Sequence, residues 1–343
     1  MVGMIFFLLG FLFTGSAAAQ MVGGETLGNL TAPVDTRRMS DHHLYGIVWG
    51  NGQFVTVGSG TLSETEVFLS PDGARWNKVS LGQAARPLSF SRDGAGVLYG
   101  IAWNGSRFAA AGERILMSAD GKSWVVSATF STCAFTRVTT NGSMFVAVGG
   151  YYGNGCIATS PDGRTWTDRT SGIEGNAAVL SGVIWNGSRF VAVGNTNRGK
   201  FGITNVFLTS PDGVTWSRHL GTRDRLVDAA WNGSLFIAVG SHRRQGIIFT
   251  SPDAKTWTQR TVKVSDPFHA VLWNGSVFVV AGLKGTVFTS PDGTTWTKRK
   301  SHTTRDLLSL AWNGSLFVVV GEGVILTSPD GAVWKALDDE PHP

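Results

Sequence analysis

Charged residues are scarce in this sequence and cysteine is nearly absent. Asp, Glu, Lys and Arg make up 15% of the 343 residues, and two residues are cysteine. Long apolar runs are missing too, because the strongest one, residues 5–13, is too short to cross a bilayer as a helix. No convincing helical stretch follows it. Glycine is plentiful (45 residues), together with Trp and Phe, which is typical of many short strands and tight turns.

One pattern recurs seven times along the chain. A turn of the form Trp-Asn-Gly-x-x-Phe is followed later by Ser-Pro-Asp-Gly-x-x-Trp. The first half begins at residues 49, 103, 140 (Thr in place of Trp), 185, 231, 273 and 312. The second half begins at residues 70, 118, 160, 210, 251, 290 and 328. Self-similarity at roughly 40–50 residues with strand-like content predicts the blades of a propeller.

The last repeat divides into four strands, at residues 307–312, 316–320, 324–327 and 333–337. The Asn-Gly pair at 313–314 predicts a hairpin in which both turn residues have positive φ. In the Ser-Pro-Asp-Gly turn, Pro presets φ, Asp can accept from the backbone two residues on, and Gly suits the left-handed position. We therefore expect an all-β, seven-bladed β-propeller of four-stranded antiparallel blades over residues 44–337, after a signal peptide (1–19) and a lead-in segment (20–43) and before a tail (338–343).

Two of the four connections in each repeat have constant length. The Trp or Thr that ends the first strand lies five residues before the Phe that begins the second, and the turn Ser lies six residues before the Trp of the fourth. The other connections vary widely. In an up-and-down meander the constant turns share one face, which we call the template rim, and the variable loops share the other, the variable rim. Variable loops on a rigid scaffold are where binding and catalysis usually lie.

The seven Ser-x-Asp-Gly-x-x-Trp turns resemble the Asp-box of sialidase-like (BNR) propellers, and they are similar also to the repeats of photosystem II assembly-factor-like proteins. The resemblance covers about residues 44–337 and implies a propeller fold. The second family implies a non-enzymatic chaperone or docking role. The turns are one residue shorter than the usual Asp-box, with Ala119 in place of Pro in the second repeat and Ala254 in place of Gly in the fifth.

The seven turn aspartates are better interpreted as structural than as catalytic, because a catalytic site needs one set of residues and not seven. We expect the Asp carboxylate and Ser hydroxyl to bond turn amides and the Trp to pack between blades. The resemblance to sialidases would imply an Arg-Ile-Pro motif near the N-terminus and a Tyr/Glu nucleophile pair. No Arg-Ile-Pro motif occurs, and the four tyrosines are Tyr45, Tyr99, Tyr151 and Tyr152. No sialidase active-site residue can therefore be placed on this chain.

The N-terminus and the cysteines predict an exported protein. Residues 5–13 form the apolar core of a secretory signal, and Ala17 and Ala19 give a small-x-small cleavage pattern before Gln20, although the segment before the core lacks Lys and Arg. An uncleaved anchor is the alternative. Cys133, at the start of a first strand, and Cys156, expected in the next variable loop, predict a disulfide in one blade, which fits a secreted or periplasmic location. Two unpaired thiols are the alternative.

The first strands line the central channel, so their early residues predict the site. Three positions before the turn Trp most repeats have a small residue, but the third has Arg137 and the fifth has Asp228. A charge at this depth needs a partner or a ligand. Around them we expect the variable loops 151–156, 195–205 and 242–246. The full set of predicted ligand-binding residues is Arg137, Asp228, Arg225, Arg305, Asp306, His269, Tyr151 and Tyr152.

The composition favours a binding module over an enzyme. The net charge of +5 suits a protein partner or an acidic glycan on the variable rim, and the scattered positive residues of an exported chain do not favour nucleic acid. No spacing indicates a metal site, and we expect no cofactor, a monomer, and no transmembrane span after signal cleavage. The alternative is an exported glycoside hydrolase or polysaccharide lyase that uses rim carboxylates with His42, His269 or Tyr45 as acid or base.

Overall fold

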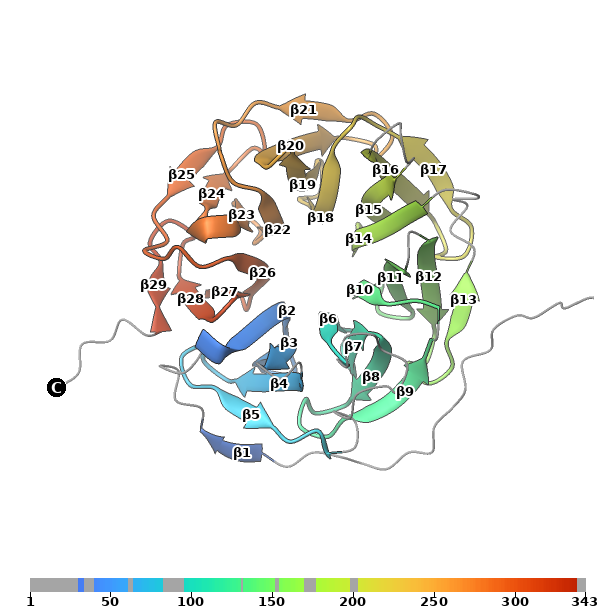
Figure 1. Ribbon diagram of the computed structural model, residues 1–343, viewed down its shortest axis with the longest axis vertical. Helices are drawn as coiled ribbons and strands as arrows, with labels where there is room; N and C mark the ends of the chain where they lie inside the picture. Colours follow the sequence, from blue (N-terminus) through green and yellow to red (C-terminus); the bar gives the residue numbers. More distant parts are fainter. Residues whose placement is uncertain are drawn as a thin grey trace, which may run out of the picture.

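Seven sheets are arranged in a ring around a central channel (Figure 1). The computed structural model describes residues 30–33, 40–60, 64–82, 96–130, 132–151, 154–169, 177–197 and 203–337. Six sheets have four antiparallel strands and the first has five. The prediction of an all-β, seven-bladed propeller is confirmed. The predicted signal peptide and C-terminal tail lie outside the described residues.

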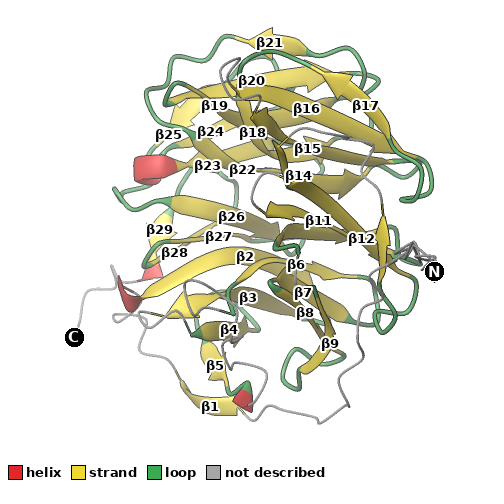
Figure 2. Cartoon of the chain, turned by 45° about the vertical axis from the view of Figure 1, so that its right-hand side comes forward, coloured by secondary structure: helices red, strands yellow, loops and turns green. Residues whose placement is uncertain are grey.

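Each blade begins at the channel and ends at the outer surface, and strands dominate the described chain (Figure 2). The innermost strands are β2 (His42–Gly50), β6 (Leu98–Trp103), β10 (Phe135–Thr140), β14 (Ala177–Trp185), β18 (Arg225–Trp231), β22 (Phe268–Trp273) and β26 (Leu307–Trp312). The second strands are β3 (Gln53–Gly60), β7 (Phe108–Gly112), β11 (Phe145–Tyr151), β15 (Phe190–Asn197), β19 (Phe236–His242), β23 (Phe278–Gly282) and β27 (Phe317–Gly321).

The third and fourth strands complete the blades. The third strands are β4 (Thr65–Ser70), β8 (Arg114–Ser118), β12 (Asn154–Ser160), β16 (Ile203–Ser210), β20 (Gln245–Ser251), β24 (Val287–Ser290) and β28 (Val324–Ser328). The fourth strands are β5 (Asn77–Val79), β9 (Val125–Thr129), β13 (Thr167–Arg169), β17 (Ser217–Leu220), β21 (Thr258–Arg260), β25 (Thr297–Arg299) and β29 (Lys335–Ala336). A short 3-10 turn, η4 (Leu283–Gly285), lies between β23 and β24. None of the described helices is long and apolar enough to span a membrane.

Register places both constant turns at the same edge of every sheet. In the first blade Trp49 pairs with Phe54, and Phe54 pairs with Ser70, so the start of each constant turn lies in one row. The same row recurs in the last blade, where Trp312 pairs with Phe317 and Phe317 with Ser328. The variable connections therefore lie at the opposite edge, as the sequence predicts.

The Ser-Pro-Asp-Gly turns use their polar side chains on their own backbone, as expected. In the sixth blade Asp292 accepts hydrogen bonds from the backbone N–H groups of Thr294 and Thr295 at 2.8 Å, and Ser290 Oγ accepts from Gly293 N at 2.8 Å. Gly293 has φ of 72°, so the left-handed position is real. In the fifth blade Ala254 takes this position at φ of 61°, a conformation that costs a residue with a Cβ about 1–2 kcal/mol.

The Asn-Gly turns differ from the prediction in six blades. Positive φ at both residues occurs only at Asn51 and Gly52, in the first blade, where the turn has two residues because Gly50 precedes the pair. In the second blade Asn104 instead bonds its own turn, since its Oδ1 accepts from Ser106 N and Arg107 N. The connection has the same length in every blade, but in these six blades Asn-Gly begins one residue earlier, and the Asn side chain rather than a left-handed Asn closes a four-residue turn.

The hydrophobic core lies between neighbouring blades. Trp124 of the second blade is fully buried against Val55 and Leu69 of the first, and its indole N–H donates to Gly121 O. Trp76 of the first blade packs with Val318 and Ile325 of the last, so this packing also closes the ring. The expectation that the turn Trp packs between blades is confirmed.

The N-terminal lead-in segment adds one strand. β1 (Leu30–Pro33) pairs antiparallel with β5 and makes the first sheet five-stranded. Several strands also run further toward the variable rim than predicted. In the fifth blade, for example, β19 ends at His242 and β20 begins at Gln245, so the turn between them consists of Arg243 and Arg244 alone.

Candidate functional site

Every innermost strand carries a β-bulge on its way through the channel. In β2, Leu44 pairs with Gly58 and Gly46 with Val57, which leaves Tyr45 as an extra residue. The same shift recurs in all seven blades, at the position occupied by Tyr99 and His269 elsewhere in the ring. Bulges re-aim side chains and are common next to functional sites. The residue after the extra one is the channel position that the sequence analysis selected, three residues before the turn Trp or Thr140.

A glycine stands opposite each bulge, a signal that the sequence analysis missed. A Cβ on Gly58 would collide with the backbone of His43 and Leu44, and the other six blades repeat this crowding. The seven glycines are Gly58, Gly112, Gly149, Gly194, Gly240, Gly282 and Gly321. Each of them lies four residues after the Phe that begins the second strand, and this constant position could have predicted the bulges.

The channel is too narrow for a side chain at three of the seven positions that follow the bulge, which are glycines. A Cβ on Gly100 would lie 2.8 Å from the Cα of Arg137, and one on Gly182 would lie 2.9 Å from the Cα of Asp228. Neighbouring blades thus meet backbone to backbone. Arg137 and Asp228, the two charged residues at this position, each lie beside a glycine of the preceding blade, Gly100 and Gly182.

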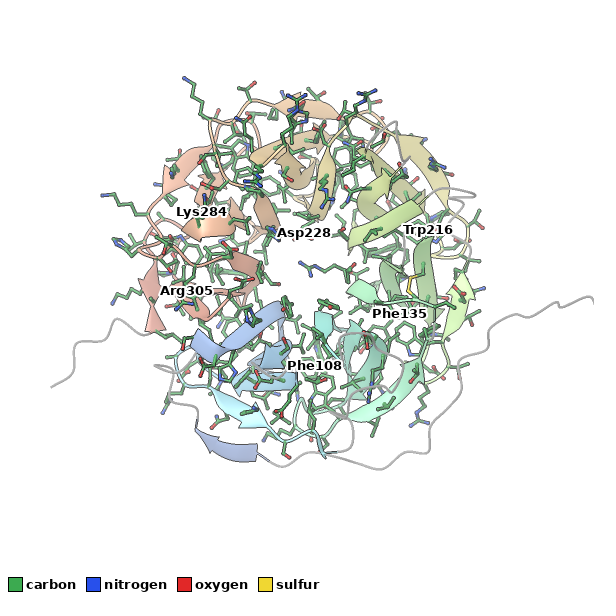
Figure 3. All side chains as sticks on the ribbon, in the orientation of Figure 1. Phe108, Phe135, Trp216, Asp228, Lys284 and Arg305 are labelled. Atoms are coloured by element: carbon green, nitrogen blue, oxygen red, sulfur yellow. A yellow bond between two sulfur atoms is a disulfide. The ribbon has the colours of Figure 1, made fainter. Side chains whose placement is uncertain are left out.

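Asp228 projects toward the channel (Figure 3). Its Oδ2 accepts a hydrogen bond of 3.0 Å from Val271 N in the next blade. Ser309 makes the same link between the last and first blades, where its Oγ accepts from Ile47 N at 3.3 Å. Burial raises the pKa of the Asp228 carboxyl above its usual value, and the positive charge of Arg137 opposes that rise. Part of the role of Asp228 is therefore to join two blades.

Arg137 interacts with groups of several other blades, by hydrogen bonds and through its charge. Its Nη1 donates to Tyr99 O at 3.1 Å and to Thr136 O at 3.2 Å. Burial lowers the pKa of His269, the Arg137 charge lowers it further, and Asp306 opposes this. The charge of Arg137 thus acts on the pKa values of Asp228 and His269 of the predicted set, and the lowered pKa of His269 favours its neutral form.

Aromatic side chains line the channel on the side of the first two blades. The rings of Tyr45 and Tyr99 lie 5.3 Å apart, and His43 stacks on Tyr45 with centroids 6.4 Å apart. The channel therefore has aromatic side chains on the first two blades and the polar side chains Arg137, Asp228 and His269 on the third, fifth and sixth blades. Such a combination suits a ligand with both a flat apolar part and a charged or hydrogen-bonding part.

The predicted rim residues form separate contacts. Arg225 and Arg305 are exposed, and Asp306 accepts a hydrogen bond of 2.8 Å from Lys284 N. Tyr151 is the last residue of β11, and Tyr152 lies outside the described residues. The predicted loop 195–205 is corrected, since β15 extends to Asn197 and β16 begins at Ile203, and 151–156 is shortened by β11 and β12 in the same way.

Two buried carboxylates with histidine partners were not anticipated. Glu66 is 2% exposed and lies 2.7 Å from His42 Nδ1 and 2.6 Å from Lys78 Nζ. Burial alone would raise the pKa of Glu66, but these two partners outweigh it and lower the pKa. On the far side of the ring Asp224, 4% exposed, lies 2.6 Å from His242 Nδ1. The partners of each pair come from different elements, Glu66 from β4 and His42 from β2, and Asp224 from the connection before β18 and His242 from β19, so the pattern of a single strand does not reveal them.

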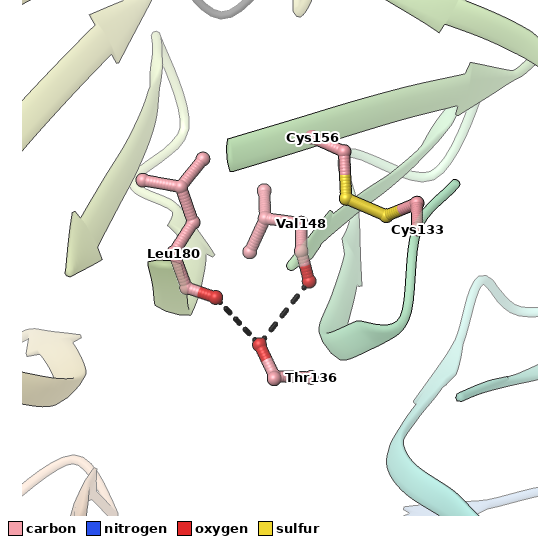
Figure 4. Close-up of a disulfide and its surroundings, with 5 residues drawn as sticks. All are labelled: Cys133, Thr136, Val148, Cys156 and Leu180. Atoms are coloured by element: carbon pink, nitrogen blue, oxygen red, sulfur yellow. Dashed lines mark hydrogen bonds between the residues drawn. A yellow bond between two sulfur atoms is a disulfide. The ribbon is translucent and has the colours of Figure 1, made fainter. Parts of the chain in front are cut away.

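Cys133 and Cys156 form a disulfide, as the sequence predicts (Figure 4). Their Cα atoms are 6.2 Å apart. Cys156 was expected in the variable loop, but it lies within β12, where it pairs with Gly149. The bond ties the entry of β10 to the third strand of the same blade. It lies beside Thr136, whose hydroxyl donates to Leu180 O at 2.6 Å.

The described residues contain no group of three or more His, Cys, Asp or Glu side chains that could hold a metal ion. The groups that could bind a ligand are therefore the Asp228 carboxyl, His269 and the aromatic rings in the channel, and the cations of the variable rim.

Comparison with known proteins agrees with a propeller fold. A family model described as the DUF6242 beta propeller domain matches residues 227–343. No curated protein matches. A solved structure entitled "YCF48 bound to D1 peptide" is 16% identical over 92% of this chain and 99% of that one, with a TM-score of 0.57. This agrees with the predicted similarity to photosystem II assembly-factor-like propellers.

Two other solved structures have the same architecture. The WD40 propeller domain of Doa1 is 10% identical over 92% of this chain and 98% of that one, with a TM-score of 0.58. The Swd1 propeller domain of Myceliophteria thermophila is 10% identical over 88% and 99%, with a TM-score of 0.56. At these identities the likeness concerns the fold alone. The resemblance to sialidase-like propellers stays a prediction.

Proposed function

We propose that this protein is an exported, non-enzymatic binding module that holds an acidic segment of a partner protein on its variable rim. The observation that carries the proposal is the distribution of charge in the last three blades. Eight exposed cations lie on the variable connections there and at the strand ends beside them: Arg223, Arg225, Arg243, Arg244, Lys263, Lys284, Lys300 and Arg305.

Of the carboxylates on the same rim of these blades, Glu322 is half exposed and lies 3.9 Å from His43, and the other three are engaged within the protein. Asp224 contacts His242, Asp266 lies 3.0 Å from Lys284 Nζ, and Asp306 accepts from a backbone N–H. On the template rim the balance differs, because each repeat contributes one turn aspartate there. A cationic face attracts anionic partners and speeds their association. A peptide is the favoured partner because a solved propeller of this fold has a bound peptide, which is an argument by analogy.

Peptide binding tests the proposal directly. A fluorescent oligoglutamate peptide should bind the purified protein, with affinity that falls as salt is raised. Replacement of Arg223 and Arg225 by Ala should weaken binding severalfold. Replacement of Arg164 and Lys255, exposed cations on the template rim, is the matched control and should leave affinity unchanged. Equal losses in the two double variants would show that the variable rim is not the binding face. Binding of an acidic polysaccharide in preference to the peptide would identify a glycan partner instead.

Export is tested separately. The disulfide supports an oxidising compartment. If the predicted signal peptide is cleaved as expected, the protein recovered from outside the cytoplasm begins at Gln20, as mass spectrometry of the intact chain would show. A chain retained in the cytoplasm with reduced cysteines would contradict this part of the proposal.

One observation favours the alternative of a carbohydrate-active enzyme. Asp228 has a raised pKa and shares the channel with His269, and a carboxyl of this kind suits a general acid. A screen for hydrolysis or lyase activity on polysaccharides distinguishes the two functions. Turnover that is abolished by Asp228→Ala in a folded variant would replace the binding module by an enzyme.

A further inference from the structure

A hollow of about 590 Å³ opens at the junction of the sixth and seventh blades. Its walls come from the turn between β23 and β24, from the end of β25, and from the connection that leads to β26. The lining residues are Lys284, Gly285, Lys298, Arg299, Lys300, Ser301, His302, Thr303, Thr304 and Arg305. Lys284 and Arg305 lie on the same side of the ring (Figure 3). Because the β23–β24 turn and the connection to β26 are both variable connections, the hollow belongs to the variable rim.

Basic side chains make up most of its lining and acidic ones are missing from it. Six of the ten residues are Lys, Arg or His, and none is Asp or Glu. Arg299 has a structural task, because its Nε donates to Thr289 Oγ1 at 2.8 Å, and Arg260 repeats this bond one blade earlier. Lys284 is shared with Asp266, 3.0 Å away. Lys298 also acts on Asp266, whose pKa its charge lowers, and Lys300 and Arg305 are exposed cations around the same space.

The preceding blade junction shows that the fold does not require this charge. A hollow of about 450 Å³ occupies the equivalent place after β21 and is lined by Gln245, Val262, Lys263, Val264 and Ser265. It has one basic residue where the next hollow has six. The repeated scaffold thus makes the cavity at both junctions, but only one of these two cavities is strongly cationic.

The cationic hollow is also held in a fixed and locally strained shape. Lys284 and His302, both in its wall, have positive φ of 52° and 59°, a region that residues with a Cβ adopt at a cost. Two bonds of 2.8 Å tie the walls together, from Gly285 N to Arg305 O and from Lys284 N to Asp306 Oδ1. The backbone that carries the cations is thus preorganised, which lowers the entropy lost on binding, although the long basic side chains still lose rotamer freedom.

We propose that this hollow binds a tetrahedral oxyanion group, the sulfate or phosphate monoester of a larger ligand. Several cations that converge from different segments match the several oxygens and the charge of such a group better than a single carboxylate. The proposal deepens the proposed function and rests on it only in taking the variable rim as the binding face. It assigns to Lys298, Lys300 and Arg305 the role of anchoring the anion.

Calorimetry with sodium sulfate and sodium phosphate at constant ionic strength tests the site in the full protein. We expect saturable binding of one anion, at least tenfold weaker in the double variant Lys300→Gln and Arg305→Gln. Lys263→Gln in the other hollow is the matched control and should bind as the unmodified protein does. Lys300→Arg, which keeps the charge, should retain binding and shows that the lost affinity is not lost folding.

The source of the anion is identified by two further probes, a sulfated monosaccharide and phosphoserine, of which the tighter binder names the parent ligand. Absence of saturable binding, or an equal loss in the Lys263→Gln control, overturns the site. Oligoglutamate binding that persists in either case would leave the proposed function standing. The two proposals can thus fail independently.

Discussion

The turn aspartates allow a sharp test of the claim that the repeated motif is structural. Asp253 in the fifth blade is the best position, because the next residue, Ala254, already holds a left-handed conformation without the help of glycine. Its Oδ1 accepts from Lys255 N and Thr256 N, both at 2.8 Å, and from the Ser251 hydroxyl at 3.0 Å. Asp253→Ala removes all three bonds, whereas Asp253→Asn keeps an acceptor oxygen.

The expected loss follows from these bonds. A hydrogen bond to a charged group contributes about 1.5–3 kcal/mol when it is buried, but Asp253 is exposed, so about 0.5–1 kcal/mol for each of the two backbone bonds is appropriate. Asp253→Ala should therefore lower the free energy of unfolding by about 1–2 kcal/mol, and Asp253→Asn by about half as much. For a chain of this size the midpoint of thermal unfolding should fall by about 2–4 °C in the Ala variant.

The pH dependence gives a second signature. The backbone N–H groups of Thr256 and Lys255 lower the pKa of Asp253 to about 2, below its value in the unfolded chain. A carboxyl with a depressed folded pKa stabilises the fold above its unfolded pKa of about 4, and this contribution is lost as the pH falls through about 2. The stability difference between the unmodified protein and Asp253→Asn should therefore shrink between pH 4 and pH 2.

The assay is urea unfolding followed by tryptophan fluorescence, with Glu64→Ala, at an exposed acidic residue outside the turns, as the control. An Asp253→Ala variant as stable as the unmodified protein would refute the structural interpretation. So would an enzymatic activity that both Asp253 variants lose without any loss of stability.

Three further predictions concern the channel and the disulfide. Gly100→Ala should lower the free energy of unfolding by about 1–3 kcal/mol in urea unfolding, because its Cβ would lie 2.8 Å from the Cα of Arg137. Cys133→Ser should lower it by about 3 kcal/mol relative to the oxidised protein, from a crosslink with a sequence separation of 23, and dithiothreitol should have no further effect on this variant. Asp228 has a raised folded pKa, so its contribution to stability falls as the pH rises from its unfolded value through the raised one. Asp228→Asn should lack that decline, which unfolding curves from pH 4 to 8 would show.

The repeated part of this fold is predictable from the sequence because each repeat states the same local chemistry. Turn Ser, Asp and Trp have the contacts expected of them, and the blade number follows from the count. The channel bulges could not be predicted from strand pattern alone, because an extra residue such as Tyr45 or His269 does not interrupt the run of strand-compatible residues around it. The prediction of positive φ at both Asn-Gly residues is wrong in six blades, because the Asn side chain there accepts hydrogen bonds from the Ser that follows and from the turn backbone.

The candidate site was predictable only in part, for a reason of geometry. Arg137 and Asp228 were selected as charges in place of small residues, and their mutual electrostatic influence is the consequence of a narrow channel. Their neighbours in the sequence do not reveal that Arg137 also acts on His269, since that contact depends on how far the ring closes. The cationic hollow combines residues from one blade and one connection, and of its lining only Arg305 was singled out.

The two rims of this ring differ in how far their residues can change without loss of stability, and this difference indicates where a binding site can vary. On the template rim, each carboxylate is already consumed by the amides of its own turn, so a substitution there costs stability before it can gain a ligand. On the variable rim, length and charge change between blades without disturbing the registered strands. The contrast between two equivalent hollows, one with a single lysine and one with six basic residues, is the clearest instance. Specificity in this protein should therefore map to the blade junctions of the variable rim rather than to the conspicuous repeated motif.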